Sequence, residues 1–64
     1  MAKNKKCACC GKYTLPPGSA YEICPVCGWE DDEVQNDNPS LAGGANEMSL
    51  EEAKKAYQAG KPIR

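Results

Sequence analysis

Two short stretches near the N-terminus, residues 12–15 and 20–23, alternate polar and apolar side chains. In each stretch the apolar residues can share one face, as they do in a half-buried strand. Four intervening residues, Pro-Pro-Gly-Ser, have the composition of a turn. The pattern predicts a short antiparallel β-hairpin. Because an isolated two-stranded hairpin is marginal in water, something else has to stabilise it.

A helical pattern occupies residues 49–59, where apolar side chains recur every three or four positions from Leu50 onward. Ser49 and Glu52 have the spacing of a capping box, in which each side chain satisfies a backbone N–H of the other residue. A glycine and a proline follow the segment, as is typical of a helix end. A helix this short is not stable alone, so we expect its apolar face to pack on the hairpin.

The chain between these elements has no periodic pattern. An acidic run, residues 30–33, follows Trp29, and residues 35–48 are rich in Asn, Asp, Pro and Gly. We expect residues 35–48 to form a loop, which has to pack compactly or serve function because it is long for a small domain. The predicted core consists of Tyr13, Leu15, Tyr21, Ile23, Val26, Trp29, Val34, Leu41, Met48, Leu50, Tyr57 and Ile63.

This core is small for a chain of 64 residues that contains no phenylalanine and one tryptophan. Domains of this size usually need disulfides, a metal ion or a partner chain to fold. The five cysteines bear on that choice, since an odd number fits a disulfide framework poorly. The start of the sequence, MAKNKK, leads into no apolar stretch, so we expect no secretory signal, no membrane span and a cytoplasmic location. Disulfides are rare in that compartment, and a metal is the simpler interpretation.

The cysteines form two C-x-x-C-G motifs when they are aligned by the glycines that follow them. Cys7 and Cys10 form the first pair, and Cys24 and Cys27 form the second after thirteen intervening residues. Two thiolates at this spacing can reach one ion from a tight turn, and the glycine can adopt positive φ. We therefore predict a tetrahedral site with four sulfur ligands.

Cys9 is the surplus cysteine in this alignment, because it occupies the position that Val26 has in the second motif. A free cysteine can pack as a small hydrophobic residue, which is the simpler interpretation. It could also be a reactive thiol or an alternative ligand.

The chain contains no histidine, so the ligands have to be sulfur, which favours zinc or iron over hard ions. A closed four-sulfur zinc site lacks the open position that hydrolysis needs and is structural, so we expect one Zn²⁺ and no enzymatic activity. Iron in the same cage would give a one-electron carrier.

The charge balance argues against a nucleic-acid partner. Eight basic and nine acidic residues give a formal charge of -1, which the metal site would lower to about -3. The lysines at positions 3, 5 and 6 form one basic cluster, which we interpret as a solubilising terminus.

Three weaker patterns have simpler structural interpretations. The acidic run 30–33 does not match the calcium-loop pattern, and a solvated acidic surface is the simpler interpretation. Asp31 and Asp32 could act as an acid–base pair, but no activated nucleophile or histidine accompanies them, so we do not expect catalysis. Residues 43–46, Gly-Gly-Ala-Asn, could hold an anion before the helix, although a plain turn is the simpler interpretation.

The combination of these motifs resembles the bacterial cysteine-rich CPCC family over roughly residues 7–60. The resemblance rests on the run from Cys7 to Leu15, Tyr-Glu-Ile-Cys-Pro-Val-Cys at 21–27, Trp-Glu-Asp-Asp at 29–32, Gln35, Gly-Gly-Ala-Asn at 43–46 and Ser-Leu-x-Glu-Ala at 49–53. Ala8 stands where the family's name motif has proline, which loosens the first turn but removes no ligand. The resemblance implies a small protein that binds zinc without an established activity. The cysteine turns are also similar to those of rubredoxins and zinc ribbons.

The expected fold is therefore a small metal-stabilised α+β domain: a zinc-ribbon-like β-hairpin with two C-x-x-C-G turns and one C-terminal helix. We expect a flexible basic tail over residues 1–6, the domain over 7–60 and a second tail over 61–64. The expected function is that of a non-enzymatic module that binds another protein, in an oligomeric state that the sequence leaves open. The alternatives are a redox protein, with iron or a Cys9 thiol switch, and a nucleic-acid-binding zinc ribbon.

Three surfaces are candidates for the protein contact: the acidic run with Trp29, the loop 35–48, and the outer face of the helix with Glu51, Lys55 and Gln58. The first two supply the residues that we expect to contribute most, namely Trp29, Glu30, Asp31, Asp32, Gln35 and Asn46.

Overall fold

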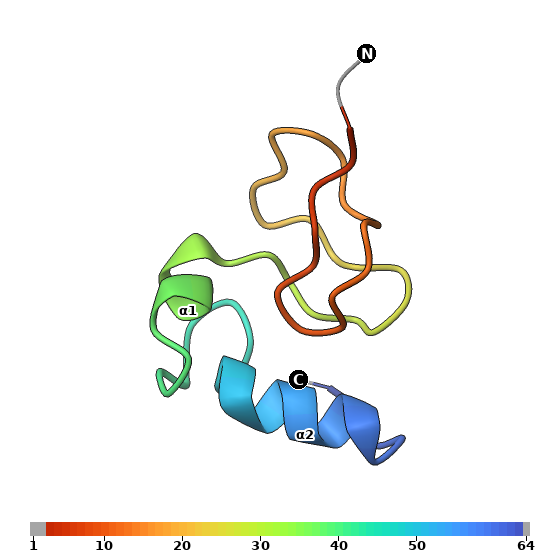
Figure 1. Ribbon diagram of the computed structural model, residues 1–64. Coiled ribbons are helices and arrows are strands. Elements are labelled where there is room, and N and C mark those ends of the chain that lie inside the picture. The colour runs from red at the N-terminus through yellow and green to blue at the C-terminus, as the bar shows by residue number, and fades with distance from the viewer. Residues whose placement is uncertain (1–2, 64) are drawn as a thin grey trace.

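The computed structural model describes residues 3–63 and contains two helices, α1 (Glu33–Asp37) and α2 (Leu50–Gln58). Backbone pairing in the described part is limited to two isolated antiparallel bridges, Lys5 with Leu15 and Ile23 with Glu30. The two cysteine turns lie together in one half of the molecule, and the helices lie in the other half (Figure 1). The molecule is flat, with extents of 33 × 23 × 13 Å.

Each cysteine turn is the tip of its own small antiparallel loop, which differs from the predicted hairpin. Lys5 and Leu15 exchange both backbone hydrogen bonds, at 2.7 and 3.2 Å, across the first turn. Across the second turn, the Cys24 N–H donates to the Trp29 carbonyl at 2.9 Å. The predicted pairing of residues 12–15 with 20–23 is therefore not the one formed. The predicted shared apolar face is also not formed, because Leu15 is buried whereas Tyr13, Tyr21 and Ile23 are exposed. Each segment pairs across a cysteine turn, where the chain reverses within a few residues.

The first helix was missed by the sequence analysis, which assigned residues 35–48 to a loop. Asp32 caps α1, because its carboxylate accepts from the N–H groups of Val34 and Gln35. Asp and Asn are favoured N-cap residues, so the acidic run contained a candidate N-cap for a helix. The helix is only five residues long and shows no apolar period that could have revealed it.

The second helix confirms the prediction for residues 49–59. Ser49 is the N-cap, and both hydrogen bonds of the capping box with Glu52 are present, at 3.1 and 3.2 Å. The inward face of α2 places Leu50 and Ala53 in the core.

The hydrophobic core is smaller than predicted, and cysteines form much of it. Its buried members are Cys7, Cys9, Leu15, Cys24, Trp29, Leu50 and Ala53. Met48, Tyr57 and Ile63 pack against this cluster from its edge. The prediction was wrong for six residues that are exposed instead: Tyr13, Tyr21, Ile23, Val26, Val34 and Leu41. Because few aliphatic side chains are buried, the stability of the core depends on whether its cysteines are free thiols or metal ligands.

A second interior is polar and closes the loop between the helices. Gln35, fully buried, donates through Nε2 to the carbonyl oxygens of Leu41, Asn46 and Met48 at 3.0–3.2 Å. Its Oε1 accepts from the backbone and side-chain N–H groups of Asn46. A Cβ atom on Gly44 would lie 2.7 Å from a carboxylate oxygen of Asp32, so only glycine fits there without displacement.

The limits of the folded part differ slightly from the predicted boundaries. Lys5 takes part in backbone pairing and Ile63 packs on the core, although the sequence assigned both to terminal tails. Residues 1, 2 and 64 of those tails lie outside the described residues. Within the described part, no helix has the length and apolar character needed to cross a membrane.

Candidate metal centre

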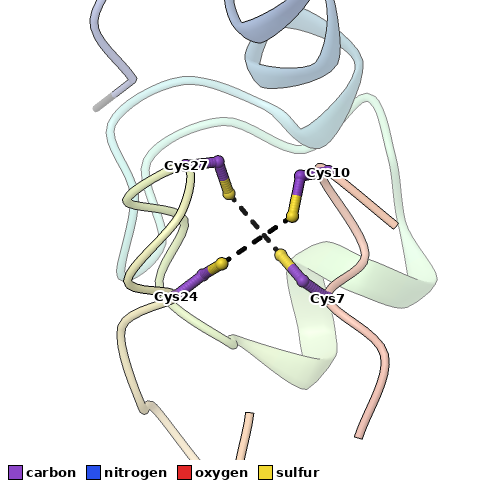
Figure 2. A group of neighbouring side chains, drawn as sticks. All are labelled: Cys7, Cys10, Cys24 and Cys27. Carbon is purple, nitrogen blue, oxygen red and sulfur yellow. Dashed lines mark hydrogen bonds between the residues drawn. The ribbon is translucent and has the colours of Figure 1, made fainter. Parts of the chain in front are cut away.

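Four cysteine sulfurs converge on a common centre between the two turns (Figure 2). Cys7 and Cys10 reach it from the first turn, Cys24 and Cys27 reach it from the second, and all four Sγ atoms lie within 4.8 Å of one another. Across the centre, the Sγ atoms of Cys7 and Cys27 are 3.6 Å apart, and those of Cys10 and Cys24 are 3.8 Å apart.

These separations match a tetrahedral thiolate cage. With zinc-to-sulfur bonds of about 2.3 Å, neighbouring sulfurs of a regular tetrahedron are about 3.8 Å apart. A disulfide would need a separation of about 2 Å, and all five cysteines are free thiols. The two separations across the centre, 3.6 and 3.8 Å, therefore fit a four-coordinate metal ion.

The backbone of each turn is shaped to serve its first cysteine. Gly11 and Gly28 have φ angles of 78° and 87°, and each N–H donates at 2.9 Å to the carbonyl of the first cysteine in its turn. This closes the turn. The left-handed conformation disfavours other residues, which explains a glycine after each cysteine pair.

Backbone N–H groups inside the turns point at the sulfurs. Those of Cys9 and Cys10 hydrogen-bond the Cys7 sulfur, and those of Val26 and Cys27 hydrogen-bond the Cys24 sulfur. The two turns are thus equivalent at the backbone, and each lowers the energy of a thiolate.

Burial opposes this effect and makes the thiolates depend on a cation. Burial raises the pKa of Cys7 far above its ordinary value and raises that of Cys27 to about 12. Cys24 is the exception: although burial acts against it, the Thr14 hydroxyl and the two backbone N–H groups lower its pKa to about 6. A metal ion would supply the positive charge that lets all four sulfurs ionise.

The surplus cysteine faces the interior. Cys9 is 8% exposed and belongs to the core cluster, and burial raises its pKa to about 11. It is therefore a protonated thiol at neutral pH, which is a poor nucleophile. This arrangement matches the packing interpretation of Cys9 and gives no support to the reactive one.

The residues predicted as an interaction surface are mostly interior residues. Trp29, Asp31, Asp32, Gln35 and Asn46 are all buried, and Glu30 is half-buried. They hold the fold together through side-chain hydrogen bonds. The indole N–H of Trp29 donates to Asn36, and Asn46 bonds both the N–H and the carbonyl of Glu30.

The acidic pair and the glycine-rich turn are also occupied by structural contacts. Asp31 accepts from Lys5 Nζ at 2.8 Å and from Asn36 at 2.7 Å, while Asp32 caps α1 and accepts from the Ala45 N–H at 3.0 Å. The backbone donors at Ala45 and Asn46 are thus satisfied by protein side chains and do not form an anion site.

Thr14 lies at the site although it was not among the predicted site residues. Its hydroxyl lies 3.0 Å from the Cys24 sulfur, and it is the one non-cysteine side chain of residues 3–63 found within hydrogen-bonding distance of a site sulfur. The predicted alternation put Thr14 on the polar face of its segment and did not indicate that its hydroxyl reaches a sulfur.

Comparison with known proteins places the chain in a family. A model of the family described as cysteine-rich CPCC matches residues 5–60. The chain belongs to this family. No curated protein matches it. The matched range begins at Lys5, the first residue of the first bridged loop, and it contains all four converging cysteines.

The arrangement limits the chemistry that the site supports. Four protein sulfurs fill a tetrahedral ion, which leaves no position for a substrate or an activated water. Such a centre can stabilise a fold or, with iron, transfer one electron. The geometry by itself does not distinguish zinc from iron, since both accept four thiolates.

Proposed function

We propose that this member of the cysteine-rich CPCC family is a non-enzymatic zinc protein in which one Zn²⁺ bound by Cys7, Cys10, Cys24 and Cys27 holds the fold together. The supporting observation is the convergence of the four sulfurs at tetrahedral separations. The proposal assigns the protein to a compartment that keeps thiols reduced, because oxidation would consume the ligands.

The composition of the core also supports the proposal that the metal stabilises the fold. Cys7 and Cys24 are two of its seven buried members, and both are proposed ligands. Structural zinc sites in small peptides contribute about 10–16 kcal/mol of apparent binding energy at neutral pH. That is comparable to or larger than the net stability of about 5–15 kcal/mol of most native domains, so metal binding and folding would be one event.

We further propose that the folded module binds another protein. The three residues named on the outer face of α2, Glu51, Lys55 and Gln58, are all exposed, and so is much of the loop 35–48. In the other two surfaces the residues expected to contribute most are buried or half-buried, so we place the contact on the α2 face.

The decisive experiment is a metal titration of the reduced, metal-free chain, followed by circular dichroism and native mass spectrometry. We expect one zinc ion per chain and a gain of helical signal that saturates at one equivalent. Alanine at Cys10 or Cys27 should abolish stoichiometric binding and folding. Cys9→Ala is the matched control and should bind one zinc ion and fold. A chain that is folded without metal, or a Cys9→Ala variant that loses the metal, would contradict the proposal.

Native mass spectrometry of protein purified from cells tests the iron alternative, with which the hydrogen bonds to the sulfurs of Cys7, Cys24 and Cys27 are equally compatible. Protein purified from cells would then be red, and its native mass would exceed that of the metal-free chain by the mass of one iron ion.

A further inference from the structure

The two halves of the metal site are equivalent at the backbone but differ in their side chains. In the alignment by glycines, the third residue after Gly11 is Thr14 and the third residue after Gly28 is Asp31. Thr14 directs its hydroxyl at the Cys24 sulfur, across the site from its own turn, at 3.0 Å. Asp31 instead directs its carboxylate away to Lys5 and Asn36.

The chemistry of the two side chains explains this difference. A hydroxyl can donate to a thiolate, whereas an ionised carboxylate only accepts and would repel it. Asp31 is fully buried at its side chain and has its charge paired by Lys5 at 2.8 Å. Asp31, which follows the second turn, thus stabilises the fold, whereas Thr14, which follows the first turn, contacts a site sulfur.

Metal binding determines the direction of the Thr14 hydrogen bond. When the Cys24 sulfur carries a proton, either Oγ1 or Sγ could donate. A metal-bound Cys24 sulfur has lost its proton, so only the Thr14 hydroxyl can donate. Hydrogen bonds to charged groups are stronger than neutral ones, and Thr14 is half-buried, which limits competition from water.

On the basis of the proposed function, we propose that Thr14 is a ligand-positioning residue that stabilises the metal-bound Cys24 thiolate through its hydroxyl. The hydroxyl fixes the position of the Cys24 sulfur and draws electron density from it. A four-thiolate centre with a divalent ion carries a formal charge of -2, and this donor spreads part of that charge into the protein.

The test compares three full-length chains: wild type, Thr14→Val, which keeps the shape and removes the hydroxyl, and Thr14→Ser, which keeps the hydroxyl. Competition with a chromophoric chelator measures zinc affinity. We expect Val to weaken it about 10-fold or more, the usual effect of losing an outer hydrogen bond to a ligand, and Ser to stay within about 3-fold of wild type. Equal affinities for all three chains would overturn the proposal.

A second readout separates electronic stabilisation from a merely structural role. In the chains loaded with Co²⁺, loss of the hydrogen bond makes the thiolate a better electron donor. The sulfur-to-cobalt charge-transfer band should therefore move to longer wavelength in Thr14→Val and remain in place in Thr14→Ser. A weaker affinity with an unshifted band would mean that the substitution acts through the local structure and not through a hydrogen bond to the sulfur, and would also overturn the proposal.

A third readout needs no variant, in case Thr14→Val fails to fold. In wild-type protein loaded with NMR-active cadmium, the Thr14 hydroxyl proton should exchange slowly and show scalar coupling to the metal through the hydrogen bond. A hydroxyl proton in fast exchange without coupling would refute the assignment. Failure of the proposed function is distinguishable, because wild type would then bind no stoichiometric metal in any of the three measurements.

Discussion

At the scale of single residues, the neutral amide side chain of Gln35 fills an interior position that an aliphatic side chain would occupy in a larger core. Gln35 is fully buried and satisfied on both ends, with three carbonyl acceptors around Nε2 and two N–H donors at Oε1. Buried polar groups are tolerated when every atom is paired, and each unpaired one is costly. The identity of this side chain therefore matters as much as its size.

Replacing Gln35 by the isosteric Glu is expected to destabilise the protein by at least about 3 kcal/mol at pH 7, because it leaves three carbonyl oxygens facing a carboxylate. Burial would raise the folded-state pKa of the new carboxyl, so the loss should shrink as the pH falls toward about 4. Denaturant unfolding of the metal-loaded protein measures the effect. Gln58→Glu, on the exposed end of α2, is the control and should change stability by about 0.5 kcal/mol or less. Similar losses at both positions would show that the amide network is not responsible.

At the scale of elements, the ion pair between Lys5 and Asp31 ties the N-terminal segment to the segment that enters α1. Burial disfavours the Asp31 charge, but hydrogen bonds from Lys5 and Asn36 outweigh it and hold the pKa of the carboxyl below its usual value. The same contact raises the pKa of Lys5. A group with a depressed folded-state pKa stabilises the protein above its unfolded pKa, about 3.9 for Asp, and loses that contribution as the pH falls through the folded value.

Lys5→Met is expected to reduce the unfolding free energy by about 1–2 kcal/mol at pH 7. The estimate is below that for a fully buried pair because Lys5 is 41% exposed at its side chain. Without the ammonium group, burial would raise the pKa of Asp31, so the difference from wild type should narrow as the pH is lowered toward about 4. Denaturant unfolding of the metal-loaded chains at several pH values between about 4 and 7 measures this difference in unfolding free energy. Lys6→Met removes the same charge from the neighbouring position and should show no such narrowing; a pH-independent loss in Lys5→Met would argue against the ion pair.

At the scale of the whole molecule, the cysteine turns and α2 share one hydrophobic cluster. The buried face of α2, Leu50 and Ala53, packs into the same cluster as Cys7, Cys9 and Cys24. A nine-residue helix has little stability of its own. If the cage opens, the surface that holds the helix is lost.

Removal of the metal by a chelator under reducing conditions is therefore expected to release two groups of amides together. The first is in the cysteine turns, where the N–H groups of Gly11 and Gly28 are bonded, and the second is in α2. Hydrogen exchange followed by mass spectrometry measures both, and re-addition of one zinc equivalent should restore both. Protection of α2 that survives chelation would show that the helix is held independently of the cage.

The sequence by itself determined the four converging cysteines and the second helix. Both depend on local spacing: two thiolates two residues apart reach one point from a turn, and a capping box with an apolar stripe specifies a helix within a few residues. It also identified the surplus cysteine, because position within the turn decides which thiols can reach the centre.

The tertiary structure alone decided the partners of the alternating segments and the inside and outside of the molecule. Alternation marks faces but not which strand lies opposite, so residues 12–15 and 20–23 were paired with each other and not across their own turns. Tyr13 and Ile23 are exposed while Gln35 and Asn46 are buried, because so small a chain can bury polar side chains wherever their hydrogen bonds close. Those bonds join residues distant in sequence, and no local pattern encodes them.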